Sequence, residues 1–67
     1  MEIPGVIVRL VADKGFGFVR RTDGDVEFAF DRSAVEGAPF ETLRQGQAVT
    51  FEEGAGTRGP RARRVVI

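Results

Sequence analysis

The segment Lys14–Arg20 alternates glycine with phenylalanine and begins and ends with a cation. Because side chains along a strand alternate between its two sides, one face carries Lys14, Phe16, Phe18 and Arg20. Exposed rings stack on unpaired bases and cations attract phosphates, so this face suits single-stranded nucleic acid. Phenylalanine is usually buried, however, and an ordinary core role for Phe16 and Phe18 also fits the pattern. Residue types alone favour the core interpretation.

Histidine and cysteine are both absent from the 67 residues. This removes the usual general base near neutral pH, the usual transition-metal ligands and any disulfide. The acidic pairs Asp23/Asp25 and Glu52/Glu53 lie in or beside predicted turns, where acids are common for backbone reasons. We therefore predict no enzymatic activity, no metal, no cofactor and no small-molecule substrate.

Ten basic and ten acidic residues give a net charge of zero, which argues against holding duplex DNA by bulk charge. Nine of the ten basic residues are arginine, a choice that suits nucleic acid and is equally explained by a GC-rich genome. No apolar run exceeds three residues, so neither a signal peptide nor a membrane span is expected. The length predicts one domain over residues 1–67, and we expect a cytoplasmic protein.

Glycine and proline interrupt the chain too often for a comfortable helix. Between them, β-branched and aromatic runs predict five strands, at about 3–11, 15–20, 26–30, 47–53 and 62–67. A hairpin turn is expected at 22–25, one helical turn at 33–36 within the long connection 31–45, and a glycine-rich loop at 54–60. Five short strands in so small a chain favour a closed barrel without exposed edges.

Alternation also assigns the faces of the other strands. The residues expected to face the core are Val26, Phe28, Phe30, Val49 and Phe51, and those expected to face outward are Glu27, Ala29 and Asp31. Strand one cannot be resolved by alternation. It is expected to bend at a bulge and to serve both sides of the barrel.

Lys14-Gly15-Phe16-Gly17-Phe18-Val19 resembles the first ribonucleoprotein motif of nucleic-acid-binding domains. The RNA recognition motif requires a strand and a helix before this point, and only thirteen residues precede Lys14. The bacterial cold-shock proteins resemble the chain almost end to end, including Gly5 to Val11, Glu27 to Val35 and Arg58-Gly59-Pro60. This resemblance implies an all-β fold, a five-stranded antiparallel OB-type Greek-key barrel, that binds single-stranded RNA or DNA.

The resemblance also implies which residues bind. The positions that match the family's nucleic-acid-binding residues are Arg9, Lys14, Phe16, Phe18, Arg32, Phe40 and Arg58. Phe16, Phe18 and Phe40 would stack on bases, Lys14 would contact the backbone of the strand, and Arg58 would flank the binding face. The alternatives are a position at the barrel bottom for Phe40 and a solvated loop charge for Arg58.

The second ribonucleoprotein motif diverges from the family pattern. Arg9 replaces a tryptophan of strand one, Ala29 an aromatic residue, Asp31 a histidine and Arg32 a phenylalanine. An arginine can stack its guanidinium plane on a base, whereas Asp31 repels phosphate. We therefore predict an RNA chaperone of reduced affinity. Four arginines near the end of the chain would supply extra phosphate attraction: Arg58, Arg61, Arg63 and Arg64.

An alternative function is a protein-interaction or self-association module. Val6, Val8 and Val11 stand where the family usually carries lysine or asparagine. An exposed apolar stripe marks interfaces, and small barrels with long loops can exchange strands. The expected oligomeric state is accordingly a monomer or a weak or swapped homodimer.

Overall fold

The computed structural model describes residues 2–54 and 59–67. Within them there are six strands, two single turns of 3-10 helix and no α-helix. The strands are β1 (Ile3–Val11), β2 (Phe16–Arg21), β3 (Glu27–Asp31), β4 (Val35–Glu36), β5 (Ala48–Gly54) and β6 (Arg61–Val66). All five predicted strands are therefore present, each within two residues of its expected ends.

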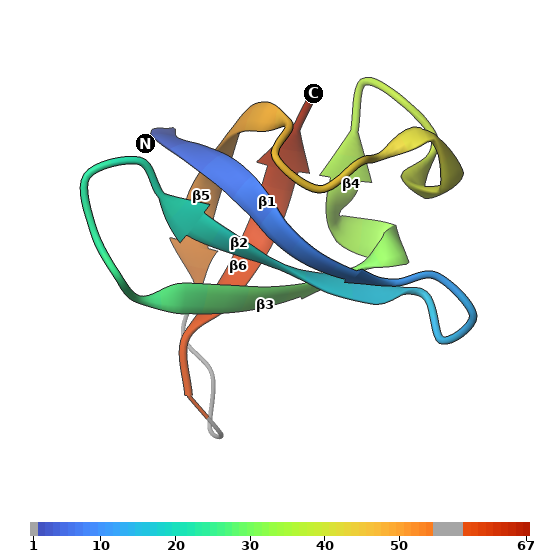
Figure 1. Ribbon diagram of the computed structural model, residues 1–67, viewed down its shortest axis with the longest axis horizontal. Coiled ribbons are helices and arrows are strands. Elements are labelled where there is room, and N and C mark those ends of the chain that lie inside the picture. Colours follow the sequence, from blue (N-terminus) through green and yellow to red (C-terminus); the bar gives the residue numbers. More distant parts are fainter. Residues whose placement is uncertain (1, 55–58) are drawn as a thin grey trace.

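The five longer strands close into a barrel (Figure 1). The order in the sheet is β3-β2-β1-β5-β6-β4, and a further pairing of β3 with β6 joins its two sides. At this closure Ala29 pairs with Arg61 in parallel, and the Ala29 N–H donates to the Pro60 carbonyl at 3.1 Å. The all-β barrel is the predicted fold class.

Strand β1 bends, as predicted, so that it pairs with both β2 and β5. Its register with β2 shifts between Ile7 and Arg9, which marks a bulge. Gly5 makes the crossing possible, because a Cβ there would lie 2.7 Å from the Phe51 ring and 2.8 Å from the Arg20 carbonyl oxygen. The lack of a side chain therefore lets the two layers of the barrel approach each other.

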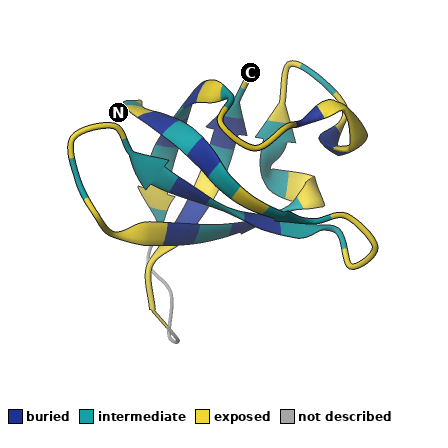
Figure 2. Cartoon of the chain, in the orientation of Figure 1, coloured by how far each residue is buried: buried dark blue, intermediate teal, exposed yellow. Residues whose placement is uncertain are grey.

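The core fills the barrel with ten buried hydrophobic side chains among the described residues (Figure 2). They are Ile7, Val19, Phe28, Phe30, Phe40, Leu43, Val49, Phe51, Ala62 and Val65. The rings of Phe28 and Phe51 lie 5.2 Å apart, and those of Phe30 and Phe40 lie 6.3 Å apart. The inward assignments of Phe28, Phe30, Val49 and Phe51 are confirmed. The inward assignment of Val26 is wrong, since it is 52% exposed in the turn before β3.

The long connection after β3 closes one end of the barrel. Its first helical turn is Arg32–Ala34, one residue earlier than predicted at its start, because Val35–Glu36 instead extends and pairs in parallel with Val65–Val66 of β6. A second 3-10 turn, Phe40–Thr42, directs Phe40 and then Leu43 into the core. The predicted loop at 54–60 lies largely outside the described residues.

The described part of the chain contains no helix with the length and apolar character that crossing a membrane requires.

Candidate nucleic-acid interface

Two phenylalanine rings lie side by side on the outer surface of β2. The centroids of Phe16 and Phe18 are 5.9 Å apart with an interplanar angle of 78°, and both side chains are half-buried. Between them Gly17 is buried, and a Cβ there would lie 2.7 Å from the Arg9 carbonyl oxygen and 3.0 Å from the Phe30 ring. The core thus presses directly on the β2 backbone at Gly17. The alternating pattern leaves Phe16 and Phe18 on the opposite, outward side.

Strand β3 extends this surface beside the two rings. Antiparallel register pairs Phe16 with Asp31 and Phe18 with Ala29, and directly paired residues project to the same face. Because the side chain of Ala29 is only a methyl group, the surface beside Phe18 lies lower than the Phe18 ring. We call the outward surface of β1–β3 the platform, and its members are Arg9, Lys14, Phe16, Phe18, Ala29 and Asp31.

Two cations border the rings. The Arg9 guanidinium carbon lies 5.9 Å from the Phe18 ring centroid, within the range of a cation–π contact. Lys14 is exposed in the turn that leads into β2. Within the described residues no carboxylate forms an ion pair with Arg9 or Lys14. Their charges are therefore free to meet phosphate.

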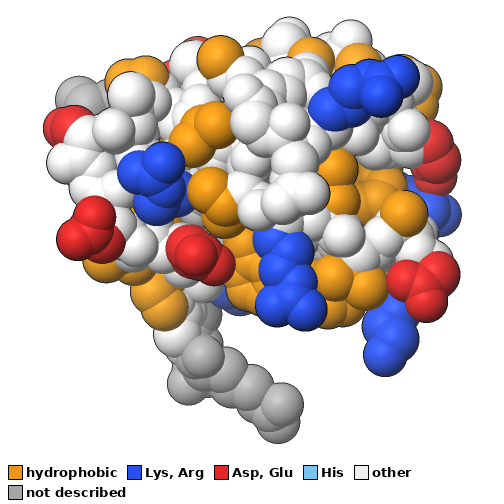
Figure 3. All heavy atoms as spheres, in the orientation of Figure 1, with side chains coloured by type: hydrophobic (Ala, Val, Ile, Leu, Met, Phe, Trp, Pro, Cys, Tyr) orange, Lys and Arg blue, Asp and Glu red, His pale blue; other side chains and the backbone are white. Residues whose placement is uncertain are grey.

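Most other arginines are already neutralised by carboxylates. Arg63 donates to Glu52 Oε1 at 2.7 Å, and this hydrogen bond lowers the pKa of Glu52 below its ordinary value. The pair therefore stabilises the fold near neutral pH, and that contribution is lost as the pH falls through the lowered pKa. Arg64 pairs with Glu36 at 3.0 Å and with Glu52 at 3.4 Å. Figure 3 shows the resulting surface, with Lys and Arg side chains separated by hydrophobic and acidic ones.

These ion pairs correct one prediction. Arg63 and Arg64 do not form a free basic strand for phosphate, because β5 and β4 place Glu52 and Glu36 against them. Arg61 differs, since its guanidinium is 3.8 Å from the Asp31 carboxylate and its strand pairs with Ala29. It lies at the platform edge, although nothing in the residue pattern distinguishes it from Arg63 and Arg64. The pairing of β3 with β6, which closes the barrel, is what places Arg61 at this edge.

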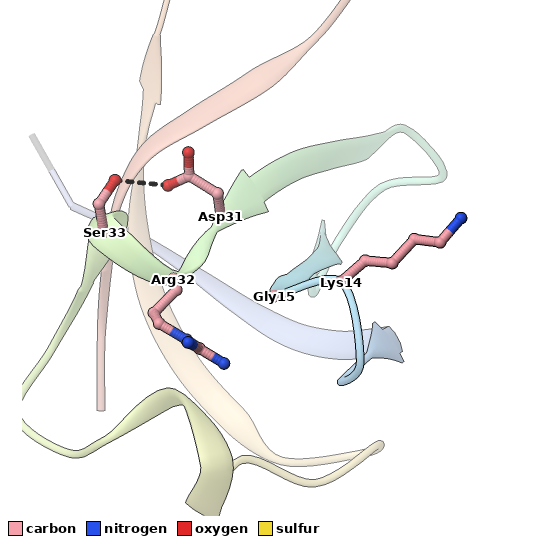
Figure 4. Close-up of a pocket in the computed structure, with 5 residues that line it drawn as sticks. All are labelled: Lys14, Gly15, Asp31, Arg32 and Ser33. Carbon is pink, nitrogen blue, oxygen red and sulfur yellow. Dashed lines mark hydrogen bonds between the residues drawn. The ribbon is translucent and has the colours of Figure 1, made fainter.

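Arg32 borders the platform at Gly15, where an added Cβ would lie 3.7 Å from the Arg32 guanidinium carbon. Its guanidinium forms an ion pair with the Glu41 carboxylate at 2.7 Å, and its Cζ is 5.5 Å from the Phe40 ring centroid. In Figure 4 its side chain points away from that of Asp31. Arg32 therefore covers the Phe40 ring. Its guanidinium, which was predicted to replace a stacking ring, is paired with Glu41.

Phe40, which was predicted to stack on bases, does not face outward beside Phe16 and Phe18. Only 4% of Phe40 is exposed, because the 3-10 turn directs its ring against Phe30 inside the barrel. Its role is the alternative one, closing the barrel end. Arg58, the remaining predicted binding residue, lies outside the described residues.

The three valines predicted to form an apolar stripe for self-association lie on β1. Val6, Val8 and Val11 are each half-buried rather than exposed. The large hydrophobic residues that are exposed in the described ranges are Val26 and Ile67.

Comparison with known proteins decides between the candidate families. A family profile described as "'Cold-shock' DNA-binding domain" matches residues 3–67. The chain belongs to the cold-shock domain family. It is similar to the Escherichia coli protein named Cold shock-like protein CspB, at 38% identity over 98% of this chain and 93% of the relative. Two proteins of Lactiplantibacillus plantarum also match: Cold shock protein 1 is 44% identical over 92% of each chain, and Cold shock protein 2 is 47% identical over 91% of each.

Membership confirms the family that the first ribonucleoprotein motif indicated. A cold-shock domain is a nucleic-acid-binding barrel, and this function is favoured over that of a protein-interaction module. In this cold-shock domain the geometry brings together Arg9, Lys14, Phe16 and Phe18. It directs the Phe40 ring into the core and pairs Arg32 with Glu41.

Proposed function

We propose that this cold-shock domain binds single-stranded RNA and DNA on the platform and acts as an RNA chaperone of reduced affinity. The observation that carries the proposal is the pair of neighbouring outward rings, Phe16 and Phe18, bordered by two cations without carboxylate partners. Bases would stack on the rings, while Arg9 and Lys14 would attract the phosphates. Holding bases unstacked in this way prevents an RNA strand from pairing with itself.

Reduced affinity follows from what the platform lacks. Ala29 offers no ring beside Phe18, and the Asp31 carboxylate repels phosphate at the edge beside Phe16. We extend the proposal to Arg58 as a flanking cation. We also propose a single domain over residues 1–67, acting in the cytoplasm without catalysis, as a monomer or a weak or swapped homodimer.

Binding should prefer single strands and depend only weakly on salt. Stacking needs unpaired bases, and a duplex hides them. With about three phosphate contacts, proposed for Arg9, Lys14 and Arg58, log affinity should fall against log salt concentration with a slope near −2. Fluorescence anisotropy of a labelled thymine heptamer and of its duplex, between about 50 and 200 mM salt, measures both quantities. Equal affinity for the two forms would contradict the proposal.

A further inference from the structure

Asp31 is the acidic residue of the platform, and it lies beside the outward ring of Phe16. It lies at the end of β3, directly across from Phe16. Its Oδ1 accepts a hydrogen bond from the Ser33 hydroxyl at 2.6 Å, which fixes the orientation of the group. Its Oδ2 is 3.8 Å from the Arg61 guanidinium, beyond hydrogen-bond distance, and the side chain is 51% exposed. Oδ2 is therefore held in place with lone pairs still open to a ligand.

The carboxylate borders a hollow of about 500 Å³ between the start of β2 and the end of β3 (Figure 4). The hollow is lined by Lys14, Gly15, Asp31, Arg32 and Ser33. Figure 4 shows Asp31 and Lys14 reaching outward from different segments, β3 and the turn before β2. Cross-strand neighbours on one face lie within about 5.5 Å at Cβ. A base stacked on Phe16 would therefore extend its edge toward Asp31.

Charge decides which part of a nucleotide can enter beside Asp31. A carboxylate offers a phosphate no hydrogen-bond donor, so the backbone of the strand is drawn instead to Lys14 and Arg9, which form no ion pair within the described residues. The part of the ligand left to face Asp31 is the edge of a base. Because a carboxylate only accepts hydrogen bonds, that edge must present donors.

Guanine presents the best matching edge. Its Watson–Crick edge carries adjacent N1–H and N2–H donors. Both can donate to one carboxylate, either one to each oxygen or both to the same oxygen. Thymine and uracil place their single N3–H donor between two carbonyl oxygens, which the carboxylate repels. Adenine and cytosine offer an amino donor beside an acceptor nitrogen. Single-stranded recognition reads these same edges.

We propose that Asp31 is a specificity-determining residue that selects guanine at the position stacked on Phe16. This inference rests on the proposed function, because it assumes that a base occupies the platform. Good two-donor contacts to a base discriminate by about tenfold or more. The chain should thus prefer a strand that carries guanine over one made only of thymine.

The test uses thymine heptamers whose central base is thymine, guanine, inosine or cytosine. Anisotropy of the unmodified protein should show guanine binding about tenfold more tightly than thymine. Inosine lacks the N2 amino group and should fall between the two. Because each heptamer carries at most one guanine, the strands do not self-assemble through guanine. A heptamer can bind in more than one register, and the tightest register dominates the measured affinity.

Two variants separate base recognition from charge. Asp31→Asn should abolish the preference for guanine while retaining or tightening thymine binding, because the repulsion of phosphate is removed. Glu27→Gln makes the same charge change on the same face of β3, away from Phe16, and should leave the ratio of guanine to thymine affinity unchanged.

The outcomes distinguish the two proposals. Equal affinity for guanine and thymine heptamers, or a preference for cytosine, would overturn the guanine assignment while leaving single-strand binding intact. A guanine preference that persists in Asp31→Asn would overturn the role of Asp31. Failure of every heptamer to bind would instead overturn the proposed function.

Discussion

Phe30→Ala is expected to leave the chain largely unfolded at 25 °C, while Phe16→Ala is expected to fold. Phe30 is 1% exposed, contacts the ring of Phe40 and lies directly behind Gly17. Truncating such a ring costs about 3–5 kcal/mol, which is comparable to the whole stability of a domain this small. Circular dichroism and thermal melts of both variants measure the difference.

Phe16→Ala is the matched control, because it removes the same ring from the outer face of the sheet. Its melting temperature should fall modestly, and its affinity for a thymine heptamer should fall about tenfold. Equal destabilisation of the two variants would show that Phe16 is a core residue after all.

Ala29→Phe is expected to tighten binding of a thymine heptamer about tenfold. Ala29 is the direct cross-strand partner of Phe18, so the new ring would extend the platform where it is now low. One stacking contact is worth about 1–3 kcal/mol. The side chain points outward, and the larger group should therefore not overfill the core.

Ala29→Leu supplies the control for this gain. It adds apolar bulk at the same position without a flat ring, and its affinity should stay within about threefold of the unmodified protein. Anisotropy measures the affinities, and thermal melts confirm that both variants fold. A folded Ala29→Phe protein that binds no more tightly would reject the platform geometry.

Alternation predicted much of the barrel because most strands have one buried and one outward face. The inward assignments of Phe28, Phe30 and Phe51 followed from a period of two, and the bulge in β1 followed from its lack of any period. Val26 failed because the turn ends one residue later than predicted, and β3 starts at Glu27. A one-residue error at a strand end is enough to reverse the assignment of that residue.

The features missed by sequence reasoning depend on contacts distant in the chain. The Phe40 ring faces the core because it packs against Phe30, which lies on another segment of the chain. Whether Arg63 is a free cation is decided by Glu52, which the register of β5 against β6 places beside it. Neither partner is marked by spacing in the sequence.

The central claim is that single strands bind the platform, and a nuclear magnetic resonance titration tests it most directly. Amide signals of isotopically labelled protein would be followed as an unlabelled thymine heptamer is added. The platform predicts the largest shifts at Phe16, Phe18 and Ala29. The apolar hollow lined by Ala48, Val49, Thr50, Val66 and Ile67 provides the reference surface, which should change little. Shifts concentrated at that hollow, with the signals of Phe16 and Phe18 unmoved, would contradict the claim.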